Sequence, residues 1–253
     1  VRAGGYEDLA GAKVVAISAG TGRKAGESRL DLLNRNVAMF REMVESLDRY
    51  APDAVLVIAT NPVDVITYVV QKLSRRPSNR VIGTGCMLDT ARFRSLLGAR
   101  YRVDPRNVHA FIIGEHGDSE VPVWSRASIG GLRIVERDVM GVKFDRAEFD
   151  ELFERVRFAG REVIARKGYT NTAIGVVIAQ LVETILDDQH SVLTVGVAME
   201  GEYDLDGLCM SIPCIVGHDG VEGRIIPVLN DEEMAGVQRS AEVLKESIAL
   251  IGL

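Results

Sequence analysis

Residues 54–83, AVLVIATNPVDVITYVVQKLSRRPSNRVIG, decide the fold class of this chain. The stretch opens with an apolar run over residues 54–59, which has the length and composition of a buried strand. Residues 63–73 then predict a helix, residues 74–80 a polar loop, and residues 81–83 a second short strand. A strand, a helix and a strand in this order predict a parallel pair with a right-handed crossover.

The preceding residues repeat the same unit. Residues 13–18 form another short apolar run, and a helix of about five turns follows it, ended by Pro52. The apolar positions of this helix recur every three or four residues, at Leu30, Leu33, Val37, Phe40, Val44 and Leu47. The first part of the chain is therefore expected to be α/β with a parallel sheet.

The pattern changes after about residue 86. We expect a strand over residues 108–113, a helix over 149–166 closed by Gly168, and a helix over 170–186. Two apolar strands, 191–199 and 208–216, are expected to pair antiparallel, before a last helix capped by Asn230 with Glu233 three residues on. This second part predicts an α+β domain, so we divide the chain into domains 1–85 and 86–253.

Composition excludes several classes of protein. The 47% hydrophobic and 26% charged residues are ordinary for a globular protein, and a net charge of −6 disfavours nucleic acid as a partner. No apolar run is long enough for a membrane span, and no signal peptide opens the chain, so no membrane partner is expected. Three cysteines without metal-ligand spacing predict a reducing, cytoplasmic location. Because the sequence begins at Val1 without an initiator Met, we expect a fragment.

The segment Gly20-Thr21-Gly22-Arg23-Lys24-Ala25 fits the pattern G-x-G-x-x-A of a dinucleotide-binding turn. We do not interpret it so, because the residues after it read as further loop rather than the start of a helix. The acidic residue expected about 20 positions later, at the end of the next strand, is also absent.

Two other segments carry candidate catalytic side chains. His116 stands between glycines just after an apolar strand, where a sheet presents side chains to ligands. Asp89, Arg92 and Arg94 fall on what we expect to be the first turns of a helix. A lone histidine is more often structural, and an Asp-Arg helix face is often only solvated, so both interpretations stay open for the segments alone.

Five motifs together resemble the lactate/malate dehydrogenase family from end to end. In chain order they are GESRLDL at 26–32, TNPVD at 60–64, LDTARFR at 88–94, GEHGDS at 114–119 and KGYT at 167–170. The resemblance implies an NAD-dependent enzyme that transfers a hydride reversibly between NADH and a small 2-oxo acid. It also implies that residues 1–85 are the remainder of a doubly wound Rossmann sheet, followed by a catalytic domain.

The resemblance assigns roles that chemistry explains. His116 is expected to be the acid/base, Asp89 to fix and stabilise its imidazole, and Arg92 to clamp the substrate carboxylate with its planar fork. Arg29 is expected to close over the substrate and polarise its carbonyl, and Asn61 to orient the substrate oxygen, with a cis bond before Pro62 common in the family. Thr170 completes the expected substrate contacts, and the expected cofactor contacts are Tyr6, Gly20, Thr21, Ala59, Thr60 and Asn61.

The resemblance also implies an earlier mononucleotide-binding half with the glycine-rich turn, which this sequence does not contain. Without it we expect the sheet to be cut at its centre, with an apolar edge exposed and the chain insoluble or inactive alone. The choice of NAD over NADP rests on the resemblance, and a homotetramer or homodimer is usual in the family.

Substrate choice in the family depends largely on one loop position, where this chain has Arg23. An enclosed arginine there would pair with the second carboxylate of oxaloacetate and would be left unpaired by pyruvate. Arg23 therefore favours malate/oxaloacetate, while a solvent-facing Arg23 stays open. Other residues are typical of L-lactate dehydrogenases: Glu27-Ser28, Glu120-Val121-Pro122, Thr170, and Arg94 with His109, which match residues that bind fructose 1,6-bisphosphate at a subunit interface.

Two rival classes remain. One is a non-enzymatic descendant kept as a binding module, against which the intact set His116, Asp89, Arg92 and Arg29 argues. The other is the NAD-dependent glycosidase group, which needs a metal held by Cys and His. Cys86 lies three residues before Asp89, but we find no set of metal ligands in the sequence and expect no metal.

Overall fold

The computed structural model describes residues 1–20 and 29–251, without the side chains of 29–33. Its N-terminal part contains β1 (Val14–Ile17), α1 (Arg29–Tyr50), β2 (Val55–Ile58), α2 (Val63–Leu73) and β3 (Val81–Gly83). Both strand pairs are parallel, with Val14 opposite Val55 and Leu56 opposite Val81. The predicted parallel sheet is confirmed.

This sheet continues into the second half of the chain. The order is β1-β2-β3-β9-β10-β11, where β9 (Ser191–Glu200), β10 (Asp206–Gly217) and β11 (Gly220–Arg224) are antiparallel to their neighbours. β3 meets β9 at a single pair, Gly83 opposite Gly196. A Cβ on Gly83 would lie 2.5 Å from the hydroxyl of Thr67, and one on Gly196 would lie 3.4 Å from the Cα of Gly83. Two glycines therefore let the parallel and antiparallel parts approach closely enough to share one sheet.

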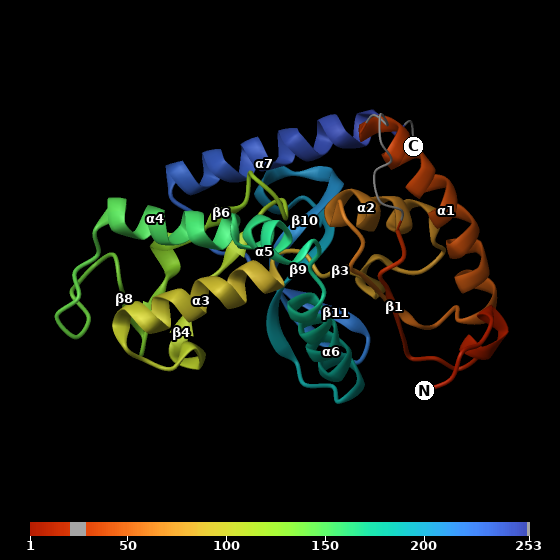
Figure 1. Cartoon of the computed structure of the whole chain (residues 1–253), viewed down its shortest axis with the longest axis horizontal. Helices are drawn as coiled ribbons and strands as arrows, with labels where there is room; N and C mark the ends of the chain where they lie inside the picture. Colours follow the sequence, from red (N-terminus) through yellow and green to blue (C-terminus); the bar gives the residue numbers. More distant parts are fainter. Residues whose placement is uncertain (21–28, 252–253) are drawn as a thin grey trace.

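Helices cover both faces of the six-stranded sheet (Figure 1). α1, α2 and α7 (Asp231–Ala249) lie on one face, where α2 and α7 pack against β10. α6 (Thr172–Leu186) packs against β1, β2 and β10 on the other face, beside α3 (Met87–Tyr101). The apolar side chains between these layers form the larger core, and within the described residues β1 is an edge strand.

A second, aromatic core lies beyond α3. It is closed by β4 (Val108–His109), β5 (Ile112–Ile113), β6 (Val121–Pro122), β7 (Ser128–Ile129), β8 (Leu132–Arg133) and α4 (Arg146–Arg157). The rings of Phe93 and Trp124 meet edge to face at 4.8 Å between centroids, and Trp124 contacts Phe149 at 5.7 Å. Such pairs favour one packing geometry, so this core fixes the position of α3. The described residues also form short 3₁₀ turns: η1 (Tyr6–Leu9), η2 (Ser78–Arg80), η3 (Pro105–Asn107), η4 (Trp124–Arg126) and η5 (Glu202–Asp204).

Two predicted elements are wrong in their extent. The strand expected over 108–113 is divided into β4 and β5, which pair with different strands, β7 and β6. The helix expected over 149–166 is two helices, α4 and α5 (Ala159–Lys167), separated at Phe158. The division follows burial: α4 buries four apolar side chains, whereas α5 buries none.

Other local predictions are confirmed. α2 has the predicted bounds, and Gly168 ends α5 with a φ of 84°, a value that glycine adopts without strain. Asn230 and Glu233 form the predicted capping box at the start of α7. α6 begins at Thr172, two residues later than predicted.

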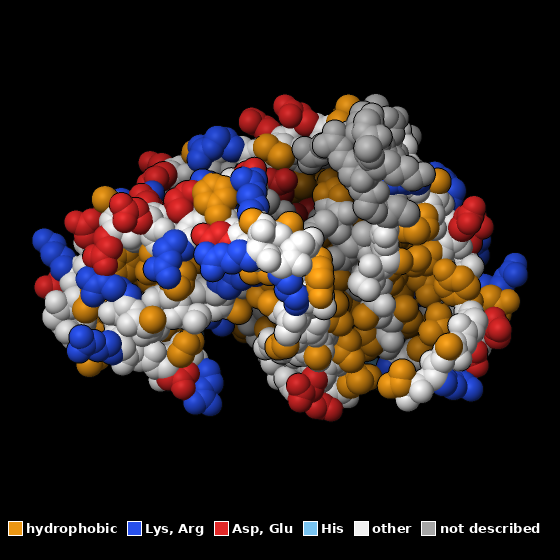
Figure 2. All heavy atoms as spheres, viewed as in Figure 1, with side chains coloured by type: hydrophobic (Ala, Val, Ile, Leu, Met, Phe, Trp, Pro, Cys, Tyr) orange, Lys and Arg blue, Asp and Glu red, His pale blue; other side chains and the backbone are white. Residues whose placement is uncertain are grey.

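On the side of the molecule seen in Figure 2, hydrophobic side chains gather over the region of β1 and α6. Charged side chains gather at the other end of the same view. Val176 and Leu186 of α6 are 64% and 53% exposed. No helix among the described residues is both long and apolar enough to cross a membrane.

Candidate active site

The polar site is built where α3 packs against β5. The hydroxyl of Thr90 accepts a hydrogen bond from the backbone N–H of Ile112 at 3.1 Å, which joins the first turn of α3 to β5. Gly114 follows β5 with a φ of 93°, and a Cβ there would lie 2.7 Å from the hydroxyl of Ser240. Glycine therefore lets the chain turn sharply after β5, so that His116 faces the side chains of α3.

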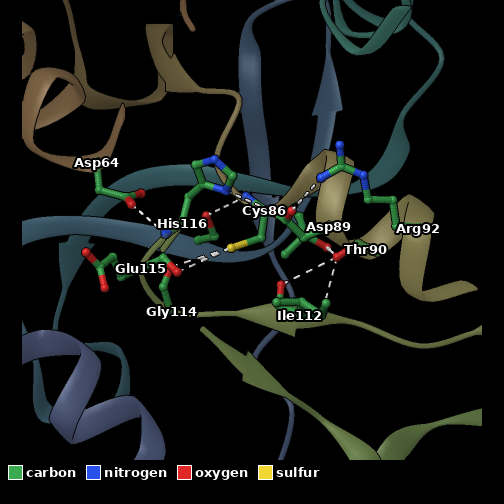
Figure 3. A network of polar contacts seen from close by, with 11 residues as sticks. Asp64, Cys86, Asp89, Thr90, Arg92, Ile112, Gly114, Glu115 and His116 are labelled. Carbon is green, nitrogen blue, oxygen red and sulfur yellow. Dashed lines mark hydrogen bonds and ion pairs between the residues drawn. The ribbon is translucent and has the colours of Figure 1, made fainter. Parts of the chain in front are cut away.

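His116 and Asp89 form a hydrogen-bonded pair. The Nδ1 atom of His116 lies 2.6 Å from Oδ2 of Asp89, whose side chain is 5% exposed. A carboxylate accepts, so Nδ1 carries the proton in this bond and Nε2 is left for other chemistry. Figure 3 shows that His116 and Arg92 reach Asp89 from opposite sides.

The charge of Asp89 decides the protonation of His116. Burial lowers the pKa of His116, but the hydrogen bond to Asp89 and the charges of Asp89 and Asp64 act the other way and raise it to about 9. The imidazole is therefore protonated at neutral pH and able to give up a proton in the range where biological acid/base chemistry operates.

Arg92 is three residues after Asp89 on the same face of α3. Its Nη1 atom lies 3.4 Å from Oδ1 of Asp89, and its side chain is 22% exposed. The long distance leaves most of the guanidinium fork available for another carboxylate.

These side chains face one cavity of about 530 Å³ between the carboxyl ends of the parallel strands, α3, α5 and α6. Six residues expected at the site line it, namely Ala59, Asn61, Asp89, Arg92, His116 and Thr170. The Asn61–Pro62 bond is cis, as expected from the resemblance.

Three expected cofactor contacts do not line this cavity. Thr60 is buried and its hydroxyl donates to the carbonyl of Ala19 at 2.6 Å, so it joins the ends of β1 and β2 rather than facing the cavity. Gly20 adjoins it, and a Cβ there would lie 2.8 Å from the methyl group of Thr60. Tyr6 is 39% exposed in η1, which precedes β1 and so lies away from the carboxyl ends of the strands. Arg23, Thr21 and the side chain of Arg29 lie outside the described residues.

Arg94 points away from the cavity. Its Nε atom donates to the carbonyl of Ala110 at 2.9 Å, and its guanidinium lies over the ring of Phe111 at 5.3 Å. His109, in β4, is exposed and adjoins Ala110 in the chain. The structure therefore places the two residues near each other but apart from His116.

Asp64 contacts the loop that carries His116, which the sequence reasoning did not predict. Its Oδ2 atom accepts a hydrogen bond from the backbone N–H of His116 at 2.7 Å, and its side chain is buried. Burial raises the pKa of Asp64 to about 7. Asp64 belongs to the quoted TNPVD motif, but nothing in the sequence tells that this motif contacts the His116 loop.

Glu120 and Cys86 also lie close to His116, which the sequence reasoning did not predict. One ligand atom from each of Cys86, Asp89, His116 and Glu120 lies within 4.8 Å of the others. The sequence did not indicate these four residues as a group, and the expectation that the chain binds no metal stays a prediction. The sequence could not show the set, because 26 residues separate Asp89 from His116 and only the α3–β5 packing brings the two segments together.

Comparison with known proteins agrees with this geometry. Residues 1–83 match the NAD-binding domain of the lactate/malate dehydrogenase family, and residues 86–251 match its alpha/beta C-terminal domain. The chain is 51% identical to L-lactate dehydrogenase of Salinibacter ruber over 98% of this chain and 79% of that protein. It is 46% identical to L-lactate dehydrogenase of Synechococcus sp., over 97% of this chain and 79% of that protein.

Solved structures show the same similarity. The crystal structure of the minor L-lactate dehydrogenase from Enterococcus mundtii, in a ligand-bound form, superposes with a TM-score of 0.93 at 36% identity, covering 98% of this chain and 79% of that one. A lactate dehydrogenase from a deep-sea metagenome library superposes with a TM-score of 0.94 at 34% identity, covering 99% and 80%.

Fold and site thus define a two-part α/β oxidoreductase. The chain belongs to the lactate/malate dehydrogenase family. It is an NAD-dependent 2-hydroxy acid dehydrogenase, and the rival interpretations as a binding module and as a glycosidase are not supported.

Proposed function

We propose that this protein interconverts pyruvate and L-lactate, with His116 as the acid/base. The observation that carries the proposal is the His116–Asp89 pair facing the same cavity as Arg92. The names of the relatives, at 42–51% identity over nearly the whole chain, favour pyruvate and lactate over other 2-oxo and 2-hydroxy acids.

Each protein group has a defined task in this reaction. Arg92 binds the substrate carboxylate, and Asn61 orients the carbonyl oxygen toward Nε2 of His116. His116 donates its proton to that oxygen during reduction and takes it back during oxidation, while Asp89 stabilises the imidazolium. Thr170 contacts the substrate from the loop before α6, and Arg29, from its place at the start of α1, is proposed to polarise the carbonyl.

The cavity also suits the cofactor. Ser18, Ala59 and Gly85 stand at the carboxyl ends of the parallel strands, and the apolar side chains of Ile174 and Ile178 come from α6. Small residues on one side and apolar ones on the other fit a flat nicotinamide ring. When bound, NADH supplies the hydride. Ala59 and Asn61 are proposed as direct contacts, with Gly20 and Thr21 as contacts to the remainder of the dinucleotide.

Arg23 supports a second candidate, malate and oxaloacetate. NADH oxidation measured at equal concentrations of pyruvate and oxaloacetate separates the two. We expect pyruvate to give the higher kcat/KM, and Arg23→Gln to leave the ratio of the two values within about twofold, as for a side chain that does not face the substrate. A reversal of the ratio by Arg23→Gln would instead establish oxaloacetate as the natural substrate, because the arginine would then read the second carboxylate.

The acid/base role of His116 predicts a pH dependence. Reduction needs protonated His116, whose pKa is about 9, so kcat/KM for pyruvate should stay level from neutral pH and fall about tenfold per unit above 9. Oxidation needs the neutral imidazole, so kcat/KM for lactate should rise with pH and level off above 9. Steady-state rates from pH 6 to 10.5 measure both; turning points below pH 7 would show that Asp89 does not control His116.

We also propose that the enzyme is a cytoplasmic homo-oligomer that binds fructose 1,6-bisphosphate through Arg94 and His109. Their separation from His116 supports a regulatory rather than a catalytic role. Adding the bisphosphate to the pyruvate assay is expected to lower KM in the original protein and not in Arg94→Gln.

A further inference from the structure

We propose that Cys86, Asp89, His116 and Glu120 bind a soft divalent cation such as Zn²⁺ or Cd²⁺, and that the bound ion inhibits the dehydrogenase. The inhibitory part rests on the proposed function of His116, whereas the binding part does not.

The geometry of the four groups is close to that of a metal site. Their ligand atoms lie within 4.8 Å of one another. Zinc binds sulfur at about 2.3 Å and nitrogen or oxygen at about 2.0 to 2.2 Å, which places tetrahedral ligands roughly 3.5 Å apart. Side-chain shifts of roughly 1 Å therefore suffice to enclose an ion.

The donor types select the ion. One thiol, one imidazole and two carboxylates suit zinc and its softer relative cadmium, whereas magnesium and calcium prefer oxygen ligands alone. Cys86 distinguishes soft cations from magnesium and calcium, because it supplies the sulfur ligand. Its side chain is fully buried, and its sulfur lies 3.9 Å and 3.8 Å from the carbonyl oxygens of Gly114 and Glu115. Figure 3 shows its sulfur directed at this backbone, beside the loop that carries His116.

A second observation, independent of the distances between the four groups, concerns the side chain of Glu120. Glu120 is 6% exposed, and its Oε1 atom has no hydrogen-bond partner among the described residues. The charge of the buried Asp89 acts on Glu120 and is opposed by the charges of His116, Arg157 and Arg92. A buried polar atom without a partner is costly, and an ion bound there would satisfy it.

Asp89, His116 and Glu120 line the cavity, which gives the ion access to three of the four ligands, whereas Cys86 is fully buried and does not line it. An ion held by His116 occupies a nitrogen that the proposed reaction needs for its proton or for the bond to Asp89. His116 therefore cannot bind the ion and act as the acid/base at the same time.

The test is a Cd²⁺ titration of the purified protein that carries the preceding mononucleotide-binding half implied by the family resemblance, monitored through the ultraviolet absorption of the cadmium–thiolate bond. We expect one equivalent to produce the band in the original protein and in Cys209→Ser, whose cysteine is equally buried on β10 but lies outside the four-residue set. Cys86→Ser should lose the band, and it should fold, because serine is a favoured residue at the N-cap position that Cys86 holds.

Two further variants separate the possible outcomes. Glu120→Gln should keep the band, because the thiolate remains, but weaken Cd²⁺ binding by at least about 10-fold, the smallest loss usual even for a residue that only supports a metal ligand. His190→Ala removes the exposed group Asp188, His190 and Glu222 and should change nothing. The rate of pyruvate reduction, relative to each variant's own metal-free rate, should fall together with the appearance of the band.

No band in the original protein, or a band that persists in Cys86→Ser, overturns the site. A band without loss of activity overturns the inhibition alone, and inactivity before any metal is added contradicts the proposed function instead.

Discussion

Replacing His116 with Gln is expected to lower kcat for pyruvate reduction by about 100- to 10,000-fold, the usual contribution of a positioned general acid. Glutamine keeps a hydrogen-bonding group near Asp89 but cannot transfer a proton at neutral pH. Because the substrate carboxylate is held by Arg92, KM for pyruvate should change much less than kcat. Stopped-flow or steady-state loss of NADH absorbance measures both constants.

The matched control for this change is His218→Gln. His218 lies at the turn between β10 and β11, where its side chain is 55% exposed, and it does not line the cavity that contains His116. This variant should keep the original kcat. If His116→Gln retained more than about a tenth of the original kcat, His116 would not be the general acid.

Replacing Arg92 with Lys is expected to reduce kcat/KM for pyruvate by about 100-fold or more. The guanidinium can make two parallel bonds to a carboxylate, and an ammonium makes one from a different position. The loss should appear mainly in KM, since the carboxylate is held in the ground state as well as in the transition state. NADH binding, followed by fluorescence, should be unchanged.

Arg100→Lys controls for changes in α3 itself. Arg100 lies on the same helix, is paired with Glu148 at the surface and does not line the cavity. Its replacement should leave both kinetic constants unaltered. If Arg92→Lys bound pyruvate as tightly as the original protein, the carboxylate clamp would have to be another of the cavity arginines, of which Arg157 and Arg161 are the described candidates.

The sequence predicted a helix or strand well where a local sequence pattern alone sets its bounds. Residues 63–73 carry a complete helix pattern and α2 has those bounds, while Asn230 with Glu233 located the start of α7. Prediction failed where tertiary packing decides. Phe158 interrupts a helical pattern that reads as continuous, because only α4 is buried against the aromatic core.

The site was predictable to a similar degree. The motifs placed His116, Asp89, Arg92, Asn61 and Thr170, and the structure brings these five to one cavity. Asp64, Cys86 and Glu120 stood in or beside the same motifs without a role. Their importance depends on distances between segments that are far apart in the chain, and no periodicity or spacing reports such distances.

The close contact of Gly83 with Gly196 has a mechanical consequence. Residues 1–83 supply the strand ends proposed to hold the nicotinamide, and residues 86–251 supply His116 and Arg92. Because a shared sheet runs through both, neither part can swing as a rigid lid against the other without breaking backbone pairing at the glycines. The spacing between the hydride donor and the proton donor is thus set at folding, and adjustment during turnover is left to segments outside the sheet.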